Sequence, residues 1–261
     1  MGKKQVNGRF GLDIMFKSWK NNLIGGGSYD DNVEGDSVKT GQWIEISEGF
    51  RRISQTKYSG DYKNGRKVGK WNIDFITKDI YSNFNGGGFY DKEDSFKTGK
   101  WVELSDRFYN YSQVTYDGEY KNCKKIGRWI IKFEDEEIGG GYYDNQDSFK
   151  TGEWIELSDR FDFYSQVTYK GKYHKGKKIG KWDILWNFKG VNYELGGGQY
   201  DHQTDGLSSI KIGFWIEQSD QFDKWQSILN EGHYENGKKI GRWVEVKFQK
   251  IKKEVEFDYV N

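Results

Sequence analysis

Carboxylates recur at one fixed place along this sequence. A Glu stands two residues after a Trp in each of four similar stretches, as Glu45, Glu103, Glu156 and Glu217. Converging carboxylates could transfer protons or hold a metal ion. Active sites are usually single and asymmetric, however, whereas these residues recur identically. We therefore predict a structural role, in which each Glu accepts a hydrogen bond from a Tyr hydroxyl, a Trp indole or a Lys.

Other catalytic patterns are weak. An Asp follows each triple glycine, and we expect it to cap a turn rather than to bind calcium: Asp30, Asp91, Asp144 and Asp201. Three His and one Cys make no zinc set. The glycines also lack the Gly-Lys-Ser/Thr that follows in a phosphate-binding loop. The sequence therefore predicts a protein that is not an enzyme, with no catalytic residues, no metal and no cofactor.

The chain is built from an internal repeat. Triple glycines begin at Gly25, Gly86, Gly139 and Gly196, and each is followed by two Gly-x-Trp motifs. The two Trp residues are 28 positions apart in every copy: Trp43 and Trp71, Trp101 and Trp129, Trp154 and Trp182, Trp215 and Trp243. We predict one domain over 1–261, with a partial repeat at 7–24 and full repeats at 25–85, 86–138, 139–195 and 196–261.

Each half-repeat looks like a β-hairpin. Asn64-Gly65 stands between two alternating runs, which is the strongest short hairpin signal because both turn residues need a positive φ. A two-residue turn there predicts that Gly60 faces Gly69 and that Tyr58 faces Trp71. The bare glycines would leave room for an aromatic ring from a neighbouring strand. We therefore expect the recurrent Trp, Tyr and Gly residues to form the core.

Composition supports a β fold. The chain has 34 Gly, 11 Trp, 18 Tyr and 17 Phe, with no Pro and no Ala, and aromatic residues favour strands. The net charge of +1 gives no field that would attract nucleic acid. A single Cys excludes an internal disulfide framework and indicates a reducing, cytoplasmic location. No apolar run approaches the ~18 residues of a membrane span.

The second half-repeats resemble a known family. Tyr58-x-Gly-x-Tyr-Lys-Asn-Gly-x-Lys-x-Gly-x-Trp71 is similar to the MORN repeat, in a variant with Trp where the common form has Gly. The resemblance is good in all four second halves and weak in the longer first halves. It implies an elongated or curled meander of antiparallel hairpins that serves as a non-catalytic scaffold, sometimes beside membrane lipid. A kelch-like β-propeller of four-stranded blades is the alternative fold.

Basic residues gather around the second-half turns, and they are the candidate binding residues: Lys63, Arg66, Lys67, Lys121, Lys124, Lys125, Lys175, Lys177, Lys178, Lys238 and Lys239. Alone they would attract anionic lipid. In a simple meander, however, acidic loops such as that at Asp91, Glu93 and Asp94 share the same edge and neutralise it within a Debye length of ~10 Å.

We therefore expect a repeat scaffold that binds a protein partner or associates with itself, and no nucleic acid. Weak binding to anionic membrane lipid through the basic tips is the first alternative. A carbohydrate-binding or enzymatic propeller is the second.

Overall fold

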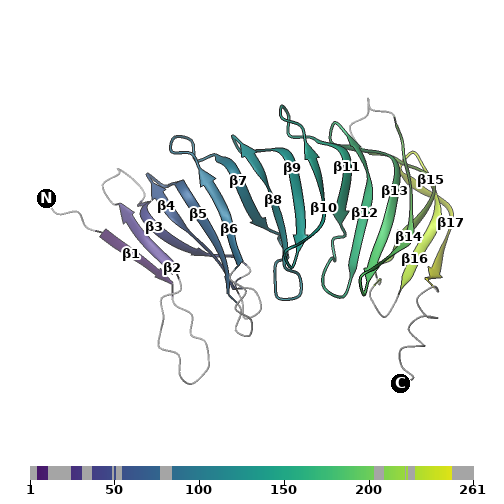
Figure 1. The fold of residues 1–261 in the computed structure, drawn as a ribbon, viewed down its shortest axis with the longest axis horizontal. Helices are drawn as coiled ribbons and strands as arrows, with labels where there is room; N and C mark the ends of the chain where they lie inside the picture. Colours follow the sequence, from purple (N-terminus) through teal and green to yellow (C-terminus); the bar gives the residue numbers. More distant parts are fainter. Residues whose placement is uncertain are drawn as a thin grey trace, which may run out of the picture. The chain divides into compact units, whose positions relative to one another are not determined.

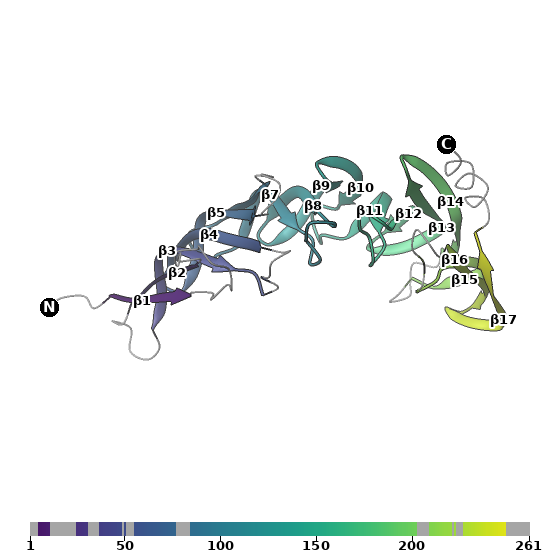
Figure 2. The ribbon, with the colours of Figure 1, turned by 90° about the horizontal axis from the view of Figure 1, so that it is seen from below.

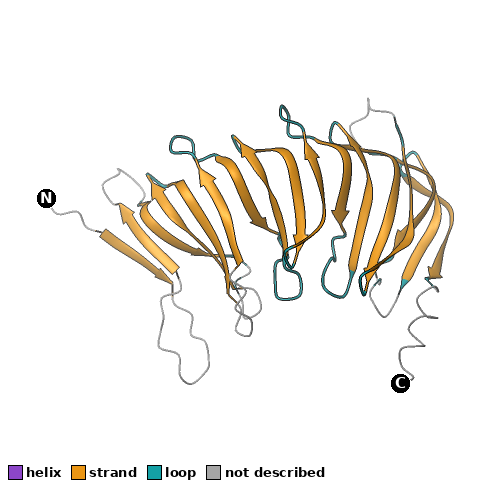
Figure 3. Cartoon of the chain, viewed as in Figure 1, coloured by secondary structure: helices purple, strands orange, loops and turns teal. Residues whose placement is uncertain are grey.

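The computed structural model describes residues 5–10, 25–30, 37–48, 50, 55–76, 84–202, 209–220, 222 and 227–248. This part of the chain is all β, with strands joined by turns and loops and no helix (Figure 3). Residues 11–24 of the expected partial repeat and residues 249–261 of the C-terminal tail lie outside the described residues.

The strands fall into two compact units. The N-terminal unit comprises 1–126 with 133–135, and the C-terminal unit comprises 127–132 with 136–261. Residues of β9 (Lys124–Phe133) belong to both. The N-terminal unit contains β1 (Gln5–Phe10), β2 (Gly25–Asp30), β3 (Val38–Ile46), β4 (Gln55–Lys63), β5 (Arg66–Ile76), β6 (Phe84–Tyr90), β7 (Lys97–Leu104) and β8 (Val114–Lys121). The C-terminal unit contains β10 (Glu136–Tyr143), β11 (Lys150–Leu157), β12 (Gln166–His174), β13 (Lys177–Phe188), β14 (Val191–Tyr200), β15 (Lys211–Gln218), β16 (Ile228–Glu235) and β17 (Lys238–Lys247).

Within each unit, every strand pairs antiparallel with the next strand along the chain (Figures 1 and 2). The predicted antiparallel hairpin array is confirmed. The propeller alternative is wrong, because the ladder continues across expected repeat boundaries, from β5 to β6 and from β13 to β14, and leaves no separate blades. The single domain over 1–261 and its repeat boundaries stay a prediction.

Trp rings and glycines form the repeating core. Trp182 is 2% exposed, and its ring lies over Gly171 of the preceding strand, where an added Cβ would be 2.4 Å from the ring. Its own backbone pairs with Gly198 of the following strand. Trp43, Trp71, Trp101, Trp154, Trp215 and Trp243 lie over a preceding glycine in the same way. The expectation that aromatic rings cover bare glycines is confirmed.

The register predicted for the second halves is wrong beyond the turn. Tyr58 pairs with Ile73 and not with Trp71, because the ladder shifts between Ser59 and Asp61. Opposite that shift, Gly69 has a φ of 68°, in the left-handed region that glycine adopts without strain. The resulting bulge advances β5 by two residues, which keeps the same side chains on the core face and places the Trp71 ring over Gly60.

A recurrent turn in the first halves completes the core, and the sequence reasoning missed it. The amide of Phe108 donates to the carbonyl of Ser105, and this turn sets the Phe108 ring 4.8 Å from the Phe75 ring. Phe222, after Ser219, packs on Trp186 in the same way at 5.1 Å. The signal was available, since Ser-Asp-x-Phe recurs at 105–108, 158–161 and 219–222.

Cys123 occupies a strained turn position. The turn residues Asn122 and Cys123 have φ values of 50° and 63°, and the equivalent second positions hold Gly65, Gly176 and Gly237. A left-handed residue with a Cβ costs about 1 kcal/mol. We expect Cys123→Gly to raise the free energy of unfolding by about that amount, measured by urea denaturation, and Cys123→Ala to give no gain.

The Cys123 thiol is exposed, so it should react rapidly with a maleimide in the folded protein. A loss of stability in Cys123→Gly would show instead that the contact between the Lys97 amide and the Cys123 sulfur, at 3.2 Å, outweighs the backbone strain.

Candidate functional site

The four recurrent Glu residues are centres of ion-pair clusters. Glu156 Oε1 accepts hydrogen bonds from the Lys150 ammonium and, at 2.7 Å, from the Tyr173 hydroxyl. Glu156 Oε2 contacts Lys178 Nζ at 2.7 Å. The Glu156 side chain is 16% exposed, so these three partners satisfy a largely buried carboxylate. The predicted structural hydrogen bond to a Tyr or a Lys is confirmed.

The same cluster occurs in every repeat. The central Glu accepts from the Tyr hydroxyl at 2.8–2.9 Å and contacts the second Lys at 2.9–3.1 Å in each of the other three copies. Their members are Glu45 with Lys39, Tyr62 and Lys67; Glu103 with Lys97, Tyr120 and Lys125; and Glu217 with Lys211, Tyr234 and Lys239.

The lysines of each cluster also rest on Trp rings. Lys150 Nζ lies 4.5 Å from the centre of the Trp154 ring, and Lys178 Nζ lies 4.1 Å from that of Trp182. A cation over an indole face adds roughly 0.5–1 kcal/mol. Glu156 therefore links the two Trp residues of its repeat, because it pairs with the lysine that lies on each Trp ring.

These contacts shift the pKa values of the Glu and Tyr side chains further away from neutral pH. Burial would raise the pKa of Glu45, but hydrogen bonds from Lys39, Lys67 and Tyr62 lower it to about 2. The Glu156 pKa is also lowered, because Lys150 and Lys178 outweigh burial. Burial and the neighbouring Glu156 raise the pKa of Tyr173. Groups that accept and return protons at neutral pH need a pKa near 7, and these shifts point the other way.

The Asp residues after the triple glycines hold turns. Asp91 accepts backbone amides from residues 93 to 96 at 2.7–3.1 Å, and Asp144 accepts those of Gln146, Asp147 and Phe149. The expected turn capping is confirmed for these two residues. For Asp30 and Asp201 it stays a prediction. Among the described residues, no three His, Cys, Asp or Glu side chains are grouped so that they could hold a metal ion.

The basic residues named from the sequence divide into two sets. Four of them turn onto the core face and join the clusters: Lys67, Lys125, Lys178 and Lys239. The other seven lie at or beside the hairpin turns. Of these, Lys63, Arg66, Lys121, Lys124, Lys175 and Lys238 are exposed, and Lys177 is half-buried. The division follows strand pairing: Lys67 and Lys178 lie opposite Tyr62 and Tyr173, whose hydroxyls bind the same Glu, and the sequence reasoning did not use this pairing.

An apolar side chain accompanies each turn, which the sequence reasoning also missed. Phe149 lies against the turn at Gly176, where an added Cβ would be 3.1 Å from its ring, and yet it is 46% exposed. Phe96 holds the equivalent position beside Cys123 and is 40% exposed. In each unit, the exposed turn cations and the Phe beside them form a surface that we call the tip edge. In the N-terminal unit it comprises Lys63, Arg66, Lys121, Lys124 and Phe96, and in the C-terminal unit it comprises Lys175, Lys238 and Phe149.

Acidic loops lie on the same edge. Arg66 Nη1 donates to the Glu93 carbonyl at 3.2 Å, and the Cys123 amide donates to the Lys97 carbonyl at 3.0 Å. The loop with Asp91, Glu93 and Asp94 therefore lies beside basic turns. The predicted alternation of acidic and basic tips is confirmed in this unit.

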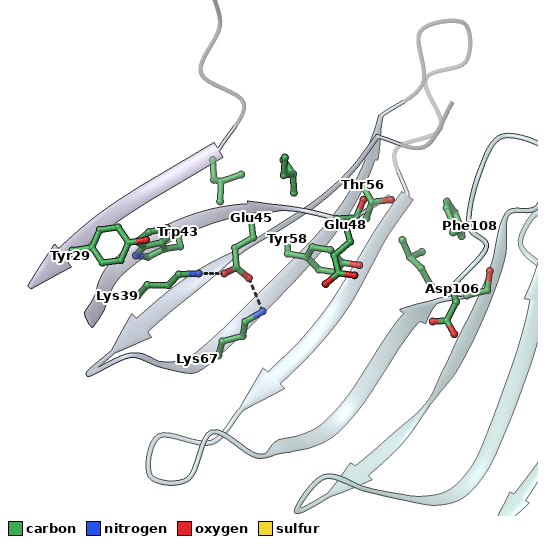
Figure 4. A pocket seen from close by; sticks show the side chains of 15 residues that line it. Tyr29, Lys39, Trp43, Glu45, Glu48, Thr56, Tyr58, Lys67, Asp106 and Phe108 are labelled. Carbon is green, nitrogen blue, oxygen red and sulfur yellow. Dashed lines mark hydrogen bonds and ion pairs between the residues drawn. The ribbon is translucent and has the colours of Figure 1, made fainter. Parts of the chain in front are cut away.

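A groove opens on the core face of the N-terminal unit (Figure 4), with a volume of about 850 Å³. Its floor contains Tyr58, between the Glu45 cluster and Thr56, and Asp106 and Phe108 stand at its far end. Lys39 and Lys67 point at Glu45, so these three charges on its wall are already paired with one another (Figure 4).

Comparison with models of protein families and with curated proteins finds no match to this chain. Within the described residues, no helix has the length and apolar character that a membrane-spanning helix requires.

Proposed function

We propose that this chain is a non-catalytic repeat scaffold that binds a protein partner along its tip edges. The observation that carries the proposal is the exposure of Phe96 and Phe149 beside hairpin turns that also bear exposed lysines. Exposed aromatic side chains surrounded by charged groups are typical of protein-binding surfaces.

The scaffold role is supported by how the ionisable residues are used. Each repeat encloses its Glu, its Tyr and two of its lysines in one cluster, with pKa values moved away from neutrality. The hairpin array is also the fold that the MORN resemblance implies, and membership of that family is part of this proposal. So is the cytoplasmic location, which rests on the single cysteine.

A protein partner is favoured over anionic lipid by the charges at the tips. Acidic Glu93 and Asp94 lie beside the basic turns. The fields of such neighbouring opposite charges offset each other, and salt at physiological concentration screens what remains beyond ~8 Å from the surface. A protein surface can match both signs, whereas an anionic membrane attracts only one.

The test is capture from an extract of the source cell. We expect a protein that binds the unchanged chain saturably to bind Phe96→Ser/Phe149→Ser about 10-fold less, because exposed aromatic anchors carry much of the energy of an interface. The matched control is Phe89→Ser/Tyr142→Ser, which removes two aromatics that are 52% and 54% exposed on strands β6 and β10. It should bind as the unchanged chain does.

Vesicles of phosphatidylcholine and phosphatidylserine provide the competing outcome. At about 0.15 M salt we expect no recruitment of the protein to them. Recruitment that Lys121→Glu/Lys124→Glu abolishes would overturn the proposal in favour of lipid binding.

A further inference from the structure

The last described strand departs from the repeat at two positions. Along β5, β9 and β13, the residues two and four places after the second Trp are buried and apolar: Ile73 and Phe75, Ile131 and Phe133, Ile184 and Trp186. In β17 the same places, after Trp243, hold Glu245 and Lys247, and both are exposed. Charges thus replace buried apolar residues at these two positions, and the alternate residues Val246 and Phe248 pack against the buried cluster of the C-terminal unit.

These two positions lie at an edge of the sheet. β17 pairs with β16, and within the described residues no strand pairs with its other side (Figure 1). The equivalent side of β13 pairs with the triple-glycine strand β14, which reduces the exposure of Trp182 to 2%, whereas Trp243 is only half-buried. Within the described part of the chain, the outer edge of β17 therefore has backbone groups without a strand partner, whereas β5 and β13 are followed by β6 and β14.

Other features of β17 match the strands that pair on both sides. Gly241 has a φ of 61° and forms the same bulge as the equivalent glycines, and the Trp243 ring lies over Gly232. The strand that normally follows approaches closely, since an added Cβ at Gly197 would be 2.0 Å from the Trp182 carbonyl oxygen. Residues 249–261 contain no glycine and so do not supply that pattern.

We propose that Glu245 and Lys247 guard this edge and prevent a second copy of the chain from pairing with β17. By strand alternation both charges share the face of the Trp243 ring, so an incoming strand would remove them from water beside that ring, which is costly. Inward-pointing charges on an edge strand are a known means of avoiding edge-to-edge association, and terminal repeats of an array commonly carry polar caps. This inference does not depend on the proposed tip-edge function.

The test restores the repeat sequence with Glu245→Ile/Lys247→Phe. In sedimentation velocity experiments we expect the unchanged chain to stay monomeric and the variant to associate increasingly with concentration. Hydrogen exchange should show β17 amides that exchange rapidly in the unchanged chain and become protected in the associated variant.

The matched control is Glu153→Ile/Lys172→Phe, which makes the same exchanges at an exposed pair on β11 and β12, strands that are paired on both sides. It should remain monomeric. Association of the control to the same extent would mean that added apolar surface alone causes assembly. A monomeric variant, or β17 amides already as protected as those of β13, would also overturn the proposal.

Discussion

Gly171→Ala should destabilise the protein by about 3 kcal/mol, because an added methyl group would overlap a buried ring that has no room to move. The new Cβ would lie 2.4 Å from the Trp182 ring, which is 2% exposed. To make room, the Trp182 ring would have to move away from the Tyr173 ring, which it contacts edge-on at 5.3 Å. It would also lose its contact with Lys178, whose ammonium group lies over it. Chemical denaturation followed by Trp fluorescence measures the loss.

The matched control is Gly152→Ala, on the neighbouring strand. Gly152 has a φ of 69°, and an added Cβ there would meet no atom within 4 Å beyond its chain neighbours. Only the left-handed backbone is strained, at about 1 kcal/mol. Equal losses at the two positions would show that the rings do not lie on the glycines as described.

Glu156→Gln should lower the free energy of unfolding by about 2 kcal/mol, because it leaves the Lys150 and Lys178 ammonium groups close together without their anion. The matched control is Glu153→Gln on the same strand. Glu153 is 62% exposed and pairs with the similarly exposed Lys172 at 3.2 Å, so its loss should cost less than about 0.5 kcal/mol. Urea denaturation of the three proteins at neutral pH makes the comparison.

The clusters also predict acid sensitivity. The pKa values of Glu45, Glu103, Glu156 and Glu217 are lowered in the folded protein, so the unfolded chain binds more protons in acid. Their stabilisation should be complete above the ordinary Glu pKa of 4.5 and should be lost as the pH falls toward 2, the value for Glu45. A Glu156→Gln variant should show a shallower loss over that window. An identical slope would mean that Glu156 is not paired.

The fold could be predicted from the sequence because local signals and repetition agree. Asn64-Gly65 specifies a hairpin turn, and recurrence of Gly-x-Trp at a constant distance shows that each hairpin packs alike. The register beyond Gly60 could not be predicted, because it depends on a bulge at which Gly69 has a positive φ. A glycine in the sequence permits that conformation but does not specify it.

The candidate site was predicted only in part. The hydrogen bonds of the Glu residues to Tyr and Lys were correctly expected, but Lys67 and Lys178 were grouped with the exposed turn residues. These lysines reach the carboxylate because they lie directly opposite Tyr62 and Tyr173 on the paired strand, so they share the core face with the Tyr that binds the Glu. Phe96 and Phe149 were overlooked because they directly precede the strands β7 and β11, where no alternation pattern marks them.

The most direct test of a structural and non-catalytic role for the repeated carboxylates is their titration, followed by NMR of ¹³C-labelled Glu side chains. We predict that Glu45 titrates at about 2 and that Glu103, Glu156 and Glu217 titrate below the ordinary value of 4.5. A carboxyl among the four that titrates close to neutral pH would contradict the account, because that is the behaviour required of an acid or base catalyst.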